Sequence, residues 1–509
     1  MPRTDRRTVR YALHRTAVAA VLAAALAGCS LAPPLQLPEI AAGERYKEQA
    51  PWTAAAPADT LPRAAWWASY GESELDGLQQ RLLAGSPDLS AALARYEQAR
   101  AYGDQLRSGL FPSVGLSADA ARARQSATRP PSGSALPRFY ESYDVGLSAG
   151  YELDLWGRVR NSVAAGEHAR AAAAADLESA RLSLQAELAD NYIVLRGLDQ
   201  QAALLDGTVA AYDKAVALTQ KRRDAGIASG LDVARAQTQL DMARSQSAQN
   251  KAQRALAEHA IAALIGEAPA TFALPASDAA ITLPTIPLDL PSTLLQRRPD
   301  IAAAQRRVAA ANAQVGVARA AWFPSISLGA TFGYQSNQAG GWLNAPNAAW
   351  AIGPSLLLDL FDAGKRRAQT AQAEAVLDEA GARYRGVVLG AFQQVEDNLA
   401  LLQHYKVAAD AEESAFASAR RSLDFAMTRY REGAVSYLEV VQSQTVALAA
   451  QRAALDLDTR QLRASVALIR ALGGGWREDA AASDPVAAAA PGAAATTADS
   501  GAPAPFLNP

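Results

Sequence analysis

The sequence predicts a mainly α-helical chain that is built as a tandem repeat and adds a few strands to a membrane β-barrel. The first observation is a duplicated block: Pro87, Asp88, Phe111 and Pro112 return as Pro299, Asp300, Phe323 and Pro324, each shifted by 212 positions (299 − 87). The second is a set of four segments in which apolar and small polar residues alternate. The third is a long proline-free stretch with a heptad pattern.

Each duplicated block is a helix that leads directly into a strand. The second block, from Leu294 to Gly333, begins its Ala-rich amphipathic helix at Arg298-Pro299-Asp300. The helix should end at Phe323-Pro324, because proline disfavours helix in the residue before it. The first block predicts the same helix from Pro87 to about Gly109.

Four strands follow from the alternating segments. We expect them from Ser113 to about Ala121, from Tyr143 to Leu155, from Ser325 to Tyr334 and from Trp350 to Leu360. One face of each is apolar and the other carries small polar residues and carboxylates. The carboxylates that the alternation places on a polar barrel lumen are Asp144, Glu152, Asp154 and Asp359. Four strands cannot close a barrel, for which about eight are needed, so the chain should supply one share of a barrel made by several copies.

A soluble, half-buried sheet would show the same alternation. Aromatic residues near the strand ends favour the aromatic girdle of a membrane barrel instead; they are Tyr143, Trp156, Tyr334 and Trp350. No segment after the N-terminal region has the roughly 20 consecutive apolar residues of a spanning helix. A part that crosses the membrane would therefore be made of strands.

A proline-free stretch from Gly157 to Gly226 predicts one very long helix. Its apolar seam has alternating spacings of three and four; the seam residues are Leu195, Leu198, Ala202, Leu205, Val209, Tyr212 and Val216. At 1.5 Å per residue such a helix reaches about 100 Å, which suits a structure that crosses the periplasm. A turn at Gly226-Ile227-Ala228-Ser229-Gly230 leads to a second helix that ends near Gly266. The second repeat does the same at Gly433-Ala434-Val435-Ser436-Tyr437, shifted by 207 positions (433 − 226).

The N-terminus predicts a lipoprotein signal. Five arginines precede an apolar run that ends in Leu26-Ala27-Gly28-Cys29, and Cys29 is the only cysteine of the chain. This arrangement resembles a bacterial lipobox, in which the cysteine is acylated and becomes the mature N-terminus. An ordinary signal peptide or a membrane helix with a chance cysteine is the alternative. Ser30 after the cysteine favours the outer membrane.

The expected organisation has six parts. They are a signal peptide (1–28), a lipid-anchored tether (29–66), a first repeat (67–266), a Pro-rich belt between the repeats (267–293), a second repeat (294–476) and a disordered Ala/Pro-rich tail (477–509). The net charge of −2 gives no electrostatic reason to expect nucleic acid as a partner. We find no metal-ligand spacing, phosphate loop or nucleophile elbow, and expect neither enzyme activity nor a cofactor.

Beyond these patterns, the chain resembles the outer-membrane factor lipoproteins of tripartite efflux systems, the TolC, OprM and NodT type. The resemblance runs from Cys29 to about Trp476 and is most specific in LLQRRPDIAAAQRRVAAANAQVGVARAAWFPSISL, with support from DLWGRVR, GLDVARAQ and SYLEVVQSQ. It implies a TolC-like fold and a homotrimer with a 12-stranded β-barrel in the outer membrane and a 12-helix periplasmic α-barrel. It also implies a passive exit duct for drugs or other toxic small molecules, driven by an inner-membrane transporter of the resistance-nodulation-division (RND) type through a periplasmic membrane-fusion adaptor.

The resemblance also implies that the two turns form a periplasmic tip that meets the adaptor and closes the duct at rest. Some members close this tip with aspartates on the second turn, but Gly433 to Tyr437 contains none. Asp232, Glu432 and Glu439 are the neighbouring candidates for the aperture, and solvated charges at helix ends are the alternative.

Two other functions remain open from the sequence. The exit duct of a type I protein-secretion system would use the same fold, although the lipobox and the RRPD block favour efflux. A structural coiled-coil lipoprotein without a pore would belong to a different class, and would form an elongated particle that conducts no ions.

Overall fold

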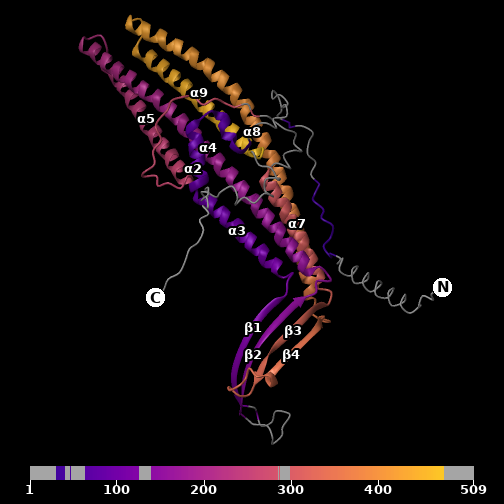
Figure 1. Ribbon diagram of the computed structural model, residues 1–509. Helices are drawn as coiled ribbons and strands as arrows, with labels where there is room; N and C mark the ends of the chain where they lie inside the picture. The colour runs from indigo at the N-terminus through magenta and orange to yellow at the C-terminus, as the bar shows by residue number, and fades with distance from the viewer. Residues whose placement is uncertain are drawn as a thin grey trace, which may run out of the picture.

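The computed structural model describes residues 30–39, 46–47, 63–124, 126, 139–284, 286 and 298–474. The predicted signal peptide, Cys29 and the predicted tail lie outside these residues, as does much of the belt. Two helices of 67 residues, α4 (Arg158–Asp224) and α8 (Lys365–Arg431), span most of the molecule. Figure 1 shows a small sheet at one end of these helices and two hairpin turns at the other.

Shorter helices complete a wall around the two long ones. Next to the sheet, α3 (Pro87–Ser108), α4, α7 (Pro299–Ala320) and α8 lie side by side in that order (Figure 1). Towards the turns, α5 (Gly230–Leu264) pairs with α4 and α9 (Tyr437–Ala471) pairs with α8. The short helices η1 (Arg63–Tyr70) and α2 (Ser73–Gly85) lie beside the middle of α4. The predicted repeat of one long and two short helices is therefore confirmed.

A close backbone contact joins the end of α5 to the end of α2. Gly266 has a φ of +79°, which side chains rarely adopt, and a Cβ there would run into the carbonyl oxygen of Gly85. This contact is how two short helices, α3 and α5, come to lie end to end along one long helix.

The four strands form one antiparallel sheet in the order β1-β2-β3-β4. They are β1 (Ser113–Arg124), β2 (Phe139–Glu152), β3 (Ser325–Ser336) and β4 (Ala348–Leu357), with the 3₁₀ turn η2 (Ala345–Asn347) before β4. Gly146 faces Gly333 where the two repeats meet. A Cβ at Gly333 would collide with the carbonyl of Val145, so this pair lets β2 and β3 approach.

The predicted strand ends were partly wrong. The second strand stops at Glu152, not at Leu155, and the fourth stops at Leu357, not at Leu360. In both cases an aspartate beyond the strand bonds the first amides of the following long helix, as described below, and turns the chain out of the sheet.

The helical core lies where each long helix packs against the shorter helices beside it. The predicted seam on α4 is buried or partly buried throughout. One cluster centres on Leu188, Leu195 and Ile261, where α4 meets α5, and a second centres on Val388, Val395 and Leu399 of α8. Among the described residues, no helix has the length and apolar character to cross a membrane.

The apolar face of the sheet is exposed among the residues that the structure describes. Val114 and Leu116 are 70% and 73% exposed, and Trp350 is 73% exposed. Neither β1 nor β4 has a second strand partner in the part of the chain that the structure describes. The sheet therefore has two open edges and one exposed apolar face.

Candidate functional site

The first hairpin turn is held by its own hydrogen bonds. Gly226 has a φ of +75°, and the amide of Ile227 donates to the carbonyl of Arg222 at 2.8 Å. The helix that follows begins with a capping box. Ser229 Oγ accepts from the amide of Asp232 at 3.2 Å, and an Asp232 carboxylate oxygen accepts from the amide of Ser229 at 3.1 Å.

The second turn has the same backbone but different side-chain support. Gly433 has a φ of +82°, and the amide of Ala434 donates to the carbonyl of Arg429 at 2.9 Å. Ser436 precedes α9 without a side-chain cap. Tyr437 is instead buried at the start of α9. This turn therefore depends on packing where the first depends on its capping box.

An arginine from the first hairpin reaches the second. The guanidinium of Arg222 lies 4.6 Å from the ring centre of Tyr430, and its Nη1 donates to the Tyr430 carbonyl at 3.2 Å. Tyr430 in turn packs against Tyr437, with ring centres 5.3 Å apart. Ala236, Ala426 and Val440 are the other buried residues of this cluster. We call the contact of Arg222 with Tyr430 the tip latch. Sequence patterns gave no signal for it.

Tyr437 stays neutral in this cluster. Burial raises the pKa of its phenol to about 12, and the neighbouring Tyr430, Tyr212 and Asp232 act in the same direction.

The three aperture candidates lie in three different settings. Asp232 belongs to the capping box, and Glu439 lies 3.8 Å from the guanidinium of Arg429. Glu432 is exposed at the end of α8. A role of any of them in closing an aperture stays a prediction. At the turn itself the exposed side chain is apolar, since Ile227 is 68% exposed.

Two of the predicted lumen carboxylates lie outside the strands. Asp154 follows β2 and accepts from the amides of Val159 and Arg160 at 3.0 and 2.8 Å, so it caps the start of α4. Burial raises the pKa of this carboxyl, but the hydrogen bonds and charge of Arg160 and the Val159 amide outweigh it, and the pKa is lowered overall. Asp154 is thus a helix cap, not a strand residue.

Asp359 also lies beyond its strand, and the cap in the second repeat is a different residue. Asp362 accepts from the amides of Gly364 and Arg366 at 3.0 and 3.1 Å. The predicted place of Asp359 on the lumen face of the fourth strand was therefore wrong, because β4 ends at Leu357 and a longer junction leads to α8. Asp144 and Glu152 do lie in β2; Asp144 accepts from Ser142 Oγ at 2.6 Å, and Glu152 accepts from Arg158 Nε at 2.7 Å.

The start of the tether is docked beside the junction of sheet and helices. Ser30 Oγ donates to Asn161 Oδ1 at 3.0 Å, four residues into α4, and Asn312 Nδ2 donates to the carbonyl of Pro33 at 2.8 Å. Gly316 leaves room for Ala32 beneath it. The sequence predicted a lipid-anchored tether, but it did not identify these docking residues.

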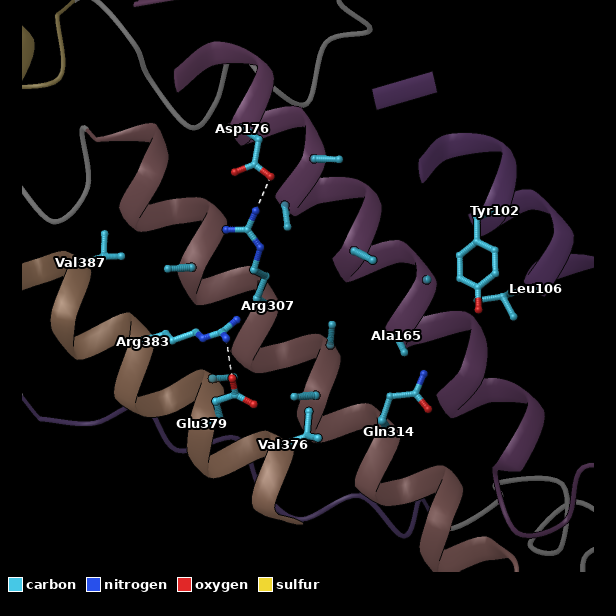
Figure 2. A pocket seen from close by; sticks show the side chains of 18 of the residues that line it. Tyr102, Leu106, Ala165, Asp176, Arg307, Gln314, Val376, Glu379, Arg383 and Val387 are labelled. Carbon is cyan, nitrogen blue, oxygen red and sulfur yellow. Dashed lines mark hydrogen bonds and ion pairs between the residues drawn. The ribbon is translucent and has the colours of Figure 1, made fainter. Parts of the chain in front are cut away.

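A groove of about 920 Å³ lies across α3, α4, α7 and α8. Figure 2 shows Tyr102 and Leu106 on α3 at one side and Val376 and Val387 on α8 at the other, with two ion pairs drawn as dashed lines. Asp176 pairs with Arg307 across α4 and α7, and Glu379 pairs with Arg383 within α8.

Known proteins share this architecture. A family model described as outer membrane efflux protein matches residues 78–267 and 290–474. The outer membrane protein OprJ of Pseudomonas aeruginosa is 34% identical over 463 residues, which cover 90% of this chain and 96% of that protein. The solved outer-membrane channel OprN is 32% identical with a TM-score of 0.81, over 88% of this chain and 100% of that one. The outer membrane protein VceC of Vibrio cholerae is 31% identical with a TM-score of 0.76, over 81% and 99%.

Proposed function

Because the chain belongs to the outer membrane efflux protein family, as an outer-membrane component of an efflux system with a TolC-like fold, we propose that three copies form its passive exit duct. The observation that carries this proposal is the sheet: as far as the structure describes the chain, it has four strands, two edges without a partner strand and an exposed apolar face. Three such sheets give twelve strands, enough to close a barrel whose apolar face meets lipid.

The helical wall, like the sheet, has two edges that a further copy of the chain could extend. Next to the sheet its order is α3-α4-α7-α8, so α3 and α8 lie at the two edges. Both edges carry exposed apolar side chains, among them Leu93 on α3 and Leu389 on α8. We propose that α8 of one copy packs against α3 of the next, which gives twelve helix positions in a ring.

The duct is proposed to be anchored through Cys29. The docked tether supports this, because Ser30 lies at the first turn of α4, where the helices join the sheet. An acyl chain on the preceding residue would then start at the level of the membrane surface. Mass spectrometry of the mature protein tests the anchor: a diacylglyceryl and acyl adduct on Cys29 is expected, and an N-terminus at any other residue would contradict it.

The hairpin turns are the proposed docking site for a periplasmic membrane-fusion adaptor, with an RND-type transporter beyond it. Ile227 and the residues around it are exposed at the far end from the sheet (Figure 1), which leaves them available to a partner. Photocrosslinking probes at Ile227 and Val435 in living cells test this contact. Capture of an RND-type adaptor supports efflux of small molecules, whereas capture of an adaptor of an ATP-driven exporter would favour protein secretion.

The duct itself is tested with purified protein in a planar bilayer. We expect a detergent-requiring trimer by light scattering, and ion conductance after reconstitution. A soluble, elongated particle that never conducts would contradict the proposal and favour a structural coiled-coil lipoprotein.

A further inference from the structure

We propose that the groove across α3, α4, α7 and α8 is a resting site for zwitterionic amphipathic small molecules inside the duct. The inference rests on the proposed function, because only a ring of copies turns this face towards a lumen. The helical wall would then bind such molecules weakly and in preference to others, which a wall without a groove would not do.

The groove is hollow because the side chains on four neighbouring helices are short. Eight of its nineteen lining residues are alanine and two are glycine, so the helix backbones themselves form much of the floor. Its volume of about 920 Å³ falls in the range of sites that hold drug-sized ligands. Leu106, Val376 and Val387 add apolar walls for the body of such a molecule (Figure 2).

The position of the tether decides which face of the wall is the inner one. On α7 the tether contacts Asn312 and Gly316, whereas Arg307 and Gln314 line the groove. At 3.6 residues per turn these two sets lie about half a turn apart. On α8 Pro38 approaches Gly381, and Arg383 lies about half a turn away in the groove. A chain anchored in the outer membrane must run outside the ring, so the groove faces the duct.

The charges of the groove favour a zwitterion over a simple ion. Asp176 with Arg307 and Glu379 with Arg383 place two cations and two anions around an apolar floor, with no net charge (Figure 2). All four side chains are substantially exposed, and exposed ion pairs contribute little, so a ligand can exchange with them at low cost. A zwitterion offers a carboxylate to the arginines and an ammonium to the acids. A ligand with a single charge pairs with only one member of an ion pair and leaves the other member without a counter-charge.

The test uses the full-length trimer in lipid nanodiscs and the fluorescent zwitterion Nε-dansyl-L-lysine. We expect saturable binding with a blue shift of the dansyl emission, because the ring enters an apolar floor. Ala310→Leu on α7 and Ala169→Leu on α4 each fill the groove and should raise the Kd at least tenfold. Ala371→Leu, at an exposed alanine of α8 that does not line the groove, is the matched control and should leave the Kd unchanged.

A zwitterion and a cation with the same fluorophore test the role of the charges. Arg307→Gln should weaken binding of dansyl-lysine at least fivefold without weakening binding of the cation dansylcadaverine, because the substitution frees the Asp176 carboxylate. Equal binding by the wild type and both filled variants would overturn the groove as the site, and so would an equal loss in the Ala371→Leu control. A trimer that conducts but shows no saturable binding refutes this inference alone. A protein that neither trimerises nor conducts refutes the proposed function.

Discussion

Replacing Arg222 by glutamine should loosen the contact between the two hairpins at the tip. The substitution removes the guanidinium from the ring of Tyr430 and weakens the hydrogen bond to its carbonyl, which are the contacts that join the two hairpins in the tip latch. A cation–π contact at a partly exposed site contributes about 0.5–1 kcal/mol, and a charged hydrogen bond about 1.5–3 kcal/mol where it is fully formed. Because Arg222 is only half-buried and the bond is long, we expect the loss of about 1–2 kcal/mol per copy. That corresponds to a shift of roughly 5- to 30-fold in a local two-state equilibrium.

Single-channel recordings in planar bilayers measure this effect. The Arg222→Gln trimer should open more often, or to a higher conductance, than the wild type. Arg222→Lys keeps the charge but loses the planar fork, and should fall between the two. Arg223→Gln is the matched control, because Arg223 is the adjacent exposed arginine on the same helix. If Arg222→Gln and Arg223→Gln conduct alike, the tip latch does not hold the closed state.

A double-mutant cycle isolates the contact itself. Arg222→Gln and Tyr430→Leu should be less than additive in the thermal stability of the trimer, with a coupling of about 0.5–2 kcal/mol. Strict additivity would mean that the two side chains act separately, whatever the conductance shows.

Three further outcomes follow from the packing. Asp154→Ala should cost about 1 kcal/mol of stability at pH 7. Because the pKa of Asp154 is lowered in the folded state, its stabilisation is present above the unfolded pKa near 4 and is lost as the pH falls through the folded pKa. The melting temperatures of the wild type and the variant should therefore converge at low pH, and a constant difference would be contrary evidence. Gly266→Ala should lower the melting temperature markedly, because the new Cβ is strained at a φ of +79° and collides with the carbonyl of Gly85. Gly230→Ala should change the melting temperature little, because the space around Gly230 is open. Similar melting temperatures of the two variants would refute the close contact as the cause. Leu389→Asp should convert trimers to monomers in size-exclusion chromatography with light scattering, because it puts a charge into the proposed interface between α8 of one copy and α3 of the next, which carries Leu93. An intact trimer would place that interface elsewhere.

The repeat and the strands were predictable because both are local patterns. The Pro-Asp start and the Phe-Pro end of α7 mark a helix whose limits depend on proline chemistry alone, and the structure has it from Pro299 to Ala320. The alternation in β2 likewise depends on a period of two. Both features can be read from the local sequence without knowing which other elements pack against them.

The strand ends and the tip could not be predicted in the same way. The end of β2 depends on whether the Asp154 carboxylate turns back to the amides of α4, which competes with continuing the strand. The tip latch joins residues 208 positions apart, and no spacing rule links them. The groove could not be predicted from the sequence for a further reason: an alanine such as Ala310 fits a close contact between helices and the lining of a groove equally well.

The two hairpins descend from one duplicated sequence, but they do not support their turns equally. The first turn closes its own capping box through Ser229 and Asp232. The second has no side-chain cap at Ser436, and its Tyr437 packs on a ring that Arg222 of the other hairpin covers. Loosening should therefore begin at the second hairpin.

Hydrogen exchange of the wild-type trimer measures this order directly. Amides of residues 434–439 should exchange faster than amides of residues 227–232, because local opening follows the weaker support. Arg222→Gln should widen the gap by accelerating the second turn alone, since the capping box of the first turn does not involve that side chain. Equal acceleration of both turns would mean that they open as one unit, and the asymmetry of their caps would then have no part in gating.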